Sequence, residues 1–145
     1  MSIDAEAMND FAAFNRNLIA HFRANAGDIK EGVFKGAPVL LLTTRGAKSG
    51  TTYVSPLAYT RDGDRVVIIA SKGGAPTNPG WFHNLVANPI VTVEVGPEKY
   101  EAKAIVTEGD ERDRLFAAQA AMMPNFAEYQ QNTSRRIPVV VLERV

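Results

Sequence analysis

Two loops of the sequence carry residue types suited to binding an anion. The first is the turn Gly46-Ala47-Lys48-Ser49-Gly50, which lies between two apolar segments. Its glycines allow a tight backbone that exposes N–H groups, while Lys48 adds a positive charge and Ser49 a hydroxyl donor. The turn is not a Walker A loop, because Ala47 stands where the glycine before the lysine is required and no helix is predicted after it. A phosphate site and a solvated hairpin are the two open interpretations.

The second loop begins at Ser71, is rich in glycine and proline, and leads directly into a predicted helix whose free N–H groups could hold an anion. The only tryptophan, Trp81, follows it beside Phe82, His83 and Asn84. A flat apolar surface next to hydrogen-bonding groups suits a planar heterocycle. The alternative is that Trp81 only anchors the helix. His83 has no acidic neighbour in sequence, so we expect a capping or solvent-facing side chain rather than a catalytic base.

Charge is balanced over the whole chain and unbalanced locally. With 16 Lys and Arg against 16 Asp and Glu, the formal net charge is zero, so no global field attracts nucleic acid or an anionic membrane. Acids outnumber bases by seven to three in residues 94–113. Residues 32–60 hold no acid and three bases, which are Lys35, Arg45 and Lys48. This asymmetry favours a local anion site.

The composition also excludes several kinds of site. The absence of cysteine removes disulfides, thiolate nucleophiles and cysteine-based metal sites, and two histidines, His21 and His83, are too few for a multi-histidine metal site. The longest apolar run is far below the ~20 residues that span a bilayer. The N-terminus is acidic and polar, unlike a signal peptide. We expect a cytoplasmic protein with no metal and no stable membrane insertion.

The elements that must position the two loops form an α+β pattern. Apolar residues at spacings of three and four predict an amphipathic helix over residues 4–26, ended by Gly27; they are Met8, Phe11, Phe14, Leu18 and Phe22. Strands are predicted at 39–44, 53–60, 66–70, 90–95, 100–106 and 137–142. Pro56 restricts the second of these to a sheet edge or a bulge, and Asp62-Gly63 predicts a hairpin.

Two further helices and a helical turn interrupt the strands. We expect one helix to begin with Asn78 as N-cap and Pro79 at its first position and to end before Pro89. The other covers residues 110–122, and a short turn follows at 126–130. At 145 residues the chain is one domain. We predict a small antiparallel split β-barrel of about six strands, with the N-terminal helix at residues 1–27 and the barrel at 28–145.

Taken in order, these segments resemble the deazaflavin (coenzyme F420)-dependent nitroreductase family, which has a split β-barrel fold that binds flavins. The resemblance runs from about Phe14 to the C-terminus. It is specific because all of the motifs occur in the order and at the spacing that the family has. The stretches that carry it are residues 41–50, 56–57, 70–75, 78–85, 87–89 and 136–140. Three positions depart from the family pattern: Ala47 and Tyr53, where arginine is common, and Met123, where nitroimidazole-activating members tend to have tyrosine.

The resemblance implies a binding site for reduced coenzyme F420. The phosphate and oligoglutamate tail are expected at Ala47, Lys48 and Ser49. The expected groove and ring contacts are Tyr53, Val54, Ser55, Pro56, Leu57, Ala58, Ile69, Ala70, Ser71, Lys72, Gly80, Trp81, Phe82, His83 and Asn84. A substrate-side cluster is expected at Met123, Phe126 and Tyr129. From the residue types alone, residues 122–129 form either part of the hydrophobic core or the wall of an adaptable apolar pocket, and the hydrophobic core is favoured.

The implied reaction is hydride transfer from the reduced deazaflavin to an activated C=C bond (enone, lactone or quinone-like) or to a nitro group. Ser71 and Tyr129 are the candidate proton donors. The expected partner is a small, hydrophobic, electron-poor substrate, and both a monomer and a homodimer are open. The alternatives are an FMN-dependent oxidoreductase on the same fold and a non-catalytic carrier of a flavin, tetrapyrrole or lipid.

Overall fold

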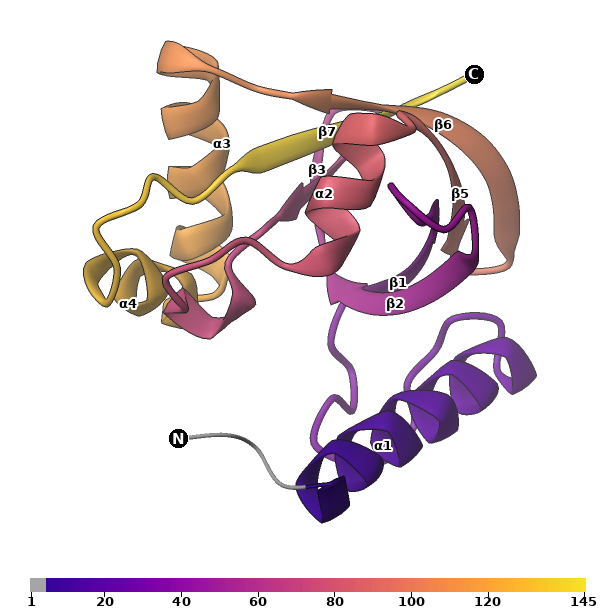
Figure 1. Cartoon of the computed structure of the whole chain (residues 1–145). Coiled ribbons are helices and arrows are strands. Elements are labelled where there is room, and N and C mark those ends of the chain that lie inside the picture. The colour runs from indigo at the N-terminus through magenta and orange to yellow at the C-terminus, as the bar shows by residue number, and fades with distance from the viewer. Residues whose placement is uncertain (1–4) are drawn as a thin grey trace.

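The computed structural model describes residues 5–145, and the side chains from Ala12 onward. One antiparallel sheet of seven strands, in the order β2-β1-β5-β6-β7-β4-β3, curls into a half-barrel that surrounds α2 on its concave side (Figure 1). In chain order the elements are α1 (Ala5–Ala24), β1 (Val39–Arg45), β2 (Thr52–Ala58), β3 (Thr60–Asp62), β4 (Arg65–Ile69), the 3-10 turn η1 (Lys72–Gly74), α2 (Gly80–Ala87), β5 (Ile90–Val95), β6 (Glu98–Val106), α3 (Gly109–Met122), α4 (Asn125–Gln131) and β7 (Val139–Arg144).

The apolar run of β1 is buried on both faces of the sheet. Leu40 and Leu42 point into the barrel core with Trp81, whereas Leu41 packs on the other face with Phe22 of α1. Successive side chains of a strand point to opposite faces, so a continuous apolar run fits a strand that is covered on both sides. The predicted α+β split-barrel fold is therefore confirmed.

The sheet has one strand more than the sequence pattern predicted. The expected strand at 53–60 is two strands, because β2 ends at Ala58 and β3 starts at Thr60 to pair with β4. Between them the backbone N–H of Tyr59 donates to the carbonyl of Pro38 at 3.1 Å. Pro56 lies in β2, which is an edge strand, as its missing N–H requires.

The expected cap of α2 is wrong. Pro79, not Asn78, holds the cap position, with extended backbone and no side-chain cap. The Oδ1 atom of Asn78 instead accepts a hydrogen bond from Nη1 of Arg135 at 2.8 Å. A bond to an ionised donor is stronger than one to a neutral amide, so the guanidinium takes the oxygen that would have capped the helix.

Helix α1 lies against β2, apart from α3 and α4 (Figure 1). Arg23 ties its C-terminal end to Glu94 of β5 by two hydrogen bonds, of 3.0 and 2.8 Å, and these lower the pKa of Glu94. Gly27 ends the segment with a φ of +84°, and a Cβ there would lie 2.6 Å from Cα of Gly96. The expected apolar positions Met8 and Phe11 lie outside the described side chains.

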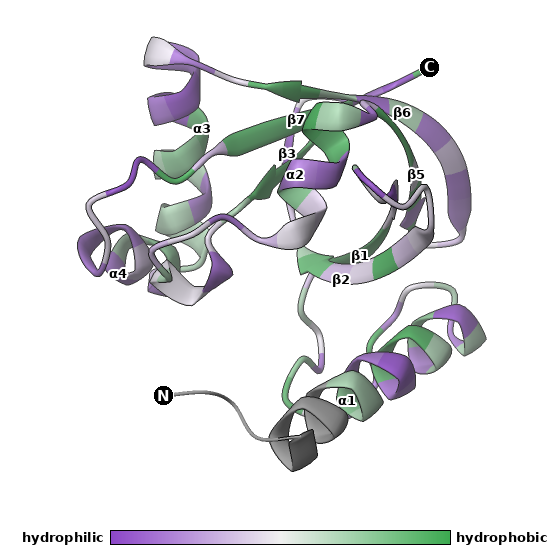
Figure 2. Cartoon of the chain, viewed as in Figure 1, coloured by the Kyte–Doolittle hydropathy of each residue, from purple (hydrophilic) through white to green (hydrophobic). Residues whose placement is uncertain are grey.

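The colouring by hydropathy follows this layering: β7 is apolar through most of its length, whereas α1 alternates between apolar and polar bands (Figure 2). Among residues 5–145, no helix combines the length and the apolarity needed to cross a membrane.

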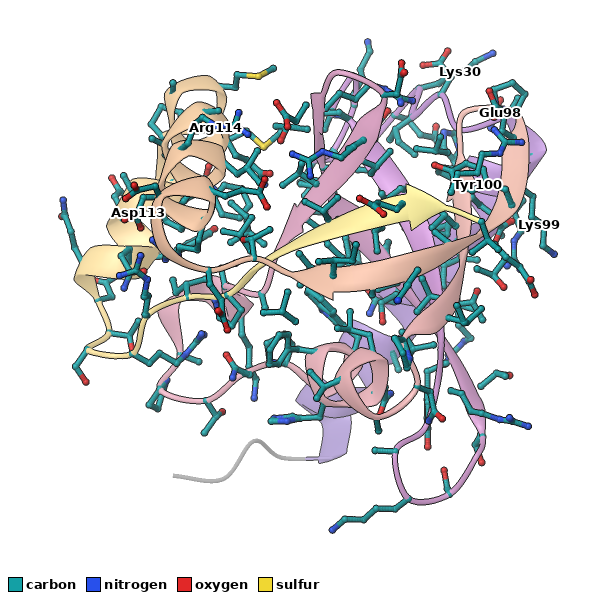
Figure 3. The ribbon with its side chains drawn as sticks, turned by 90° about the horizontal axis from the view of Figure 1, so that it is seen from above. Lys30, Glu98, Lys99, Tyr100, Asp113 and Arg114 are labelled. Carbon is teal, nitrogen blue, oxygen red and sulfur yellow. The ribbon has the colours of Figure 1, made fainter. Side chains whose placement is uncertain are left out.

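Most charge in the acidic segment 94–113 is neutralised locally. Four of its seven acids pair with arginines, through the pairs Glu94–Arg23, Glu98–Arg144, Glu111–Arg65 and Asp113–Arg136. Figure 3 shows Glu98 and Asp113 at opposite ends of the molecule, so the acids form no single patch. By contrast, Arg45 and Lys48 form no ion pair with any described residue.

Candidate functional site

The turn at residues 46–50 and the start of the helix after the second loop, Gly80 and Trp81, face one cavity. It has a volume of about 900 Å³ and lies between the β1–β2 turn and the first turn of α2. We call it the turn cavity. Its lining residues are Gly46, Ala47, Lys48, Ser49, Tyr53, Ser55, Gly80, Trp81, His83 and Asn84.

Asn84 holds the β1–β2 turn against α2. Its Oδ1 atom accepts the backbone N–H of Ala47 at 3.1 Å, and its Nδ2 atom donates to Oγ1 of Thr44 at 3.2 Å. Within the turn, Oγ of Ser49 accepts the N–H of Thr51 at 3.2 Å. A Cβ on Gly46 would lie 2.6 Å from that same Oγ, so only glycine permits this close turn without a shift of Ser49.

The tip of the turn carries donors that have no partner in the described part of the chain. The backbone N–H groups of Lys48 and Ser49 donate to none of those residues, and both residues are exposed. The Lys48 ammonium has no carboxylate within ion-pair distance there. Free backbone N–H groups beside an unpaired cation are suited to binding an anion.

A second cavity, of about 400 Å³, lies between α1, β2 and the loop before α2. We call it the apolar cavity, because its walls are mainly aliphatic and aromatic. Ser55, Gly80 and Trp81 line both cavities. The other lining residues are Phe14, Asn15, Leu18, Phe34, Val39, Pro56, Leu57, Ala58, Lys72 and Pro79.

The loop after β4 has an unusual backbone. Ser71 is in the right-handed helical region, and Lys72 follows with a φ of +49°. The N–H groups of Ser71, Lys72 and Gly73 donate to no residue in the described range, whereas that of Gly74 donates to the carbonyl of Ser71 at 3.0 Å. Such a sequence of backbone conformations can make successive N–H groups converge into a small concavity that accepts an anionic or carbonyl oxygen.

Several expected coenzyme contacts do not line either cavity. Ile69, Ala70 and Ser71 are buried where β4 ends. Val54 packs with the α1 cluster and Phe82 with the barrel core. His83 is exposed, as its lack of an acidic neighbour predicted, and unlike these residues it lines the turn cavity. A direct contact of the buried side chains with the coenzyme stays a prediction.

The expected substrate-side residues Met123, Phe126 and Tyr129 also line neither cavity. Phe126 is buried and packs edge-on against Tyr129, with ring centroids 5.4 Å apart. Both belong to a cluster that also contacts Ala58, and Ala58 lines the apolar cavity. The cluster thus lies directly behind one wall of that cavity, and a direct substrate contact stays a prediction.

Sequence reasoning missed two parts of the site. Phe14, Leu18 and Phe34 line the apolar cavity, although the stripe on α1 indicated only a buried face. The sequence did not indicate that Arg135 binds the loop before α2, because two adjacent arginines are usually interpreted as solvent-exposed charges. No group of three or more potential metal ligands occurs among the described side chains, residues 12–145.

Comparisons with known proteins point to one family. Residues 14–144 match the family model described as F420H(2)-dependent quinone reductase. A protein of Mycobacterium tuberculosis named F420H(2)-dependent quinone reductase is 43% identical over 128 residues, covering 86% of each chain. The solved structure of an F420-H2 dependent reductase, FDR-A, is 39% identical with a TM-score of 0.68 and covers 73% of this chain and 94% of its own. A structure described as a domain-swapped dimer is 33% identical with a TM-score of 0.70 and covers 93% and 98%.

Proposed function

The chain belongs to the F420H(2)-dependent quinone reductase family, and we propose that it reduces quinone-like and other activated C=C substrates with reduced coenzyme F420. The observation that carries this proposal is the pair of adjoining cavities, one with an unpaired cation and free N–H groups, the other apolar. Trp81 lines both, so a ligand in one cavity lies beside a ligand in the other.

The turn cavity fits the chemistry of the coenzyme. A phosphate and a carboxylate tail require cations and N–H donors, which Lys48 and the backbone of residues 48–49 supply. The volume of about 900 Å³ lies within the range of roughly 300–1,000 Å³ that is usual for ligand sites. The coenzyme ring would extend past Trp81, which lines both cavities, to the part of the apolar cavity that Lys72 lines. There the free N–H groups of Ser71 and Lys72 would bind an oxygen of the ring, and Trp81 would cover its apolar surface. When bound, the reduced coenzyme supplies the hydride.

We assign the small, hydrophobic, electron-poor substrate to the apolar cavity. Phe14 and Leu18 of α1 and Leu57 of β2 exclude water from its walls, which favours an apolar ring. Water exclusion also strengthens any hydrogen bond to the substrate oxygen as charge develops on it. The protein then has to hold the two molecules in reactive orientation, which by itself accounts for a large part of rate enhancement.

A binding and turnover experiment tests this function. We expect coenzyme F420 to quench the fluorescence of Trp81, the only tryptophan, and FMN to do so weakly. Anaerobic oxidation of the reduced coenzyme should then depend on both protein and menadione. Tight binding of FMN without binding of F420 would contradict the proposal, and binding without turnover of menadione or cyclohexenone would favour a carrier. The expected cytoplasmic location stays a prediction for cell fractionation.

Proton delivery to the substrate is assigned to Ser71 or Tyr129. The hydroxyl of Tyr129 accepts a hydrogen bond from Nδ2 of Asn125 at 2.9 Å, which leaves its own proton free to be donated. We predict that Tyr129→Phe lowers kcat about a hundredfold, the lower end of the range for a general acid, without changing coenzyme affinity. Steady-state kinetics and a fluorescence titration measure the two quantities, and an unchanged kcat would leave Ser71 or solvent as the donor.

A further inference from the structure

One guanidinium holds the loop between β4 and α2 from inside. Arg135 donates from Nε to the carbonyl of Ala75 at 2.8 Å and from Nη2 to that of Ser71 at 2.7 Å. Its Nη1 atom donates to the carbonyl of Ala70 at 3.2 Å and to Oδ1 of Asn78 at 2.8 Å. All three nitrogens of the side chain are therefore used on one loop, which leads directly into Trp81.

The acceptors of Arg135 are all neutral. No carboxylate of the described residues lies within ion-pair distance of it, and burial lowers its pKa from the usual value. The neighbouring Arg136 differs, because it is exposed and pairs with Asp113. A partly buried charge without a counter-ion is costly unless several dipoles are oriented toward it. The carbonyls of the loop supply those dipoles, which couples the loop conformation to Arg135.

The direction of these carbonyls fixes the direction of the N–H groups that follow them. In a trans peptide the C=O and the next N–H point to opposite sides, and all peptides described here are trans. Because Arg135 binds the carbonyls of Ala70 and Ser71, the N–H groups of Ser71 and Lys72 point away from the guanidinium. They are two of the three loop donors that have no partner among the described residues.

Arg135 is itself fixed by the helical end of the molecule. Its carbonyl accepts Nε2 of Gln130 at 2.8 Å. The Oε1 atom of Gln130 accepts Nη2 of Arg112 at 2.8 Å and the N–H of Ile137 at 3.0 Å. A continuous set of hydrogen bonds thus leads from α3 through α4 to the loop.

We propose that Arg135 is a positioning residue that aims the N–H groups of Ser71 and Lys72 at the coenzyme, and so sets coenzyme affinity without touching the ligand. The part that concerns the coenzyme rests on the proposed function. The part that concerns the loop can be tested without any ligand.

The test compares Arg135→Ala and Arg135→Lys with the matched control Arg136→Ala. Lysine keeps the charge but cannot reproduce the planar fork that serves four acceptors. We expect both Arg135 variants to raise the Kd for coenzyme F420 by about tenfold or more, as the loss of one to two well-aligned hydrogen bonds to a ligand predicts. The kcat at saturating coenzyme should change less than about threefold, and the control should match the parent protein.

Two readouts separate positioning from general loss of structure. Amide hydrogen exchange in residues 70–80 should rise in the Arg135 variants while that of β1 and β5 stays unchanged, and the emission of Trp81 should shift to the red. Methylguanidinium added to Arg135→Ala should restore both the emission and the affinity. If Arg135→Ala fails to fold, Arg135→Lys carries the same comparison.

Each outcome decides the inference. Unchanged exchange and emission in the Arg135 variants would overturn it, whether or not the coenzyme binds. A changed loop with unchanged coenzyme affinity would also overturn it, since the aimed N–H groups would then not serve the ligand. If the parent protein binds no coenzyme F420, the proposed function and this ligand role are both wrong, and the exchange data alone decide whether Arg135 orients the loop.

Discussion

The two loops beside the cavities are held in opposite ways. The loop of residues 70–78 is bound from inside by Arg135 through four hydrogen bonds. The turn of residues 46–50 is attached through one amide side chain, Asn84, and its tip is exposed. On the proposed function, the difference suits a division of work: the first loop would present fixed donors to a rigid ring, whereas the second would adjust to a flexible, charged tail.

The largest loss of stability and of coenzyme binding is expected on substitution of Trp81, which lines both cavities. Trp81→Ala removes a buried side chain of the barrel core, and such changes cost about 3–5 kcal/mol. We expect that loss of unfolding free energy in urea titrations, together with loss of coenzyme binding followed by coenzyme absorbance. Trp81→Phe, which keeps an aromatic wall, should recover most of both. Strong coenzyme binding by a folded Trp81→Ala protein would separate the indole from the site.

The positive charge of Lys48 in the 46–50 turn should contribute to coenzyme binding through electrostatic attraction. Lys48→Ala should weaken coenzyme binding by about tenfold at low salt, which is the effect of one charge-assisted hydrogen bond. The difference should shrink as salt rises, because the contact is exposed and therefore screened. Binding titrations at several salt concentrations measure this. Lys35→Ala, a base of the same segment that lines neither main cavity, is the control, and equal affinity of Lys48→Ala and parent would remove Lys48 from the site.

Loss of the Asn84 hydrogen bonds that attach the 46–50 turn should weaken coenzyme binding less than loss of Lys48, and this weakening should not depend on salt concentration. Asn84→Ala removes the acceptor of the Ala47 N–H and the donor to Thr44. We expect about a threefold to fivefold rise in the coenzyme Kd, corresponding to roughly 1 kcal/mol for a neutral hydrogen bond. The same titrations check it: a salt dependence as steep as that of Lys48→Ala would show that Asn84 acts through charge placement rather than turn geometry.

The smallest effect is expected for Asp62, which lies outside both loops and should affect the stability of the fold but not coenzyme binding. Hydrogen bonds from Arg114 and Arg65 lower the pKa of Asp62 to about 2, from an ordinary value of 3.8. A carboxyl whose pKa is lower in the folded state stabilises the fold above its unfolded pKa, and this contribution is lost as the pH falls toward 2. Asp62→Asn should therefore unfold at lower urea than the parent at pH 7, with the difference vanishing near pH 2. Coenzyme affinity at pH 7 should not change.

Much of the fold follows from local signals. The apolar run 39–44 predicts a strand, the Asp62-Gly63 pair predicts the β3–β4 hairpin, and Pro56 predicts an edge strand; the structure has all three. These signals are readable because strand faces, turn φ angles and a missing N–H depend on a few neighbouring residues. The resemblance added the ligand class, which no local signal carries.

The features that local signals missed depend on contacts between distant residues. Asn78 looked like a helix cap, but its oxygen binds Arg135, which is 57 residues away in sequence. The strand break at Tyr59 accompanies its hydrogen bond to Pro38. Phe14 and Phe34 form a cavity wall only because α1 lies against β2. Local propensity ranks conformations of one segment, and it cannot say which other segment will offer a better partner.

The sequence by itself indicated most of the strands and turns, the absence of cysteine chemistry and the cationic, glycine-rich character of the 46–50 turn, because each depends on residue type and near neighbours. Only the tertiary structure decided that this turn faces the start of α2 across one cavity, and that a single guanidinium binds the carbonyls of the 70–78 loop. The physical reason is that a charge in a half-buried position is stabilised by whichever dipoles the folded chain brings to it, and that set exists only after the sheet has closed.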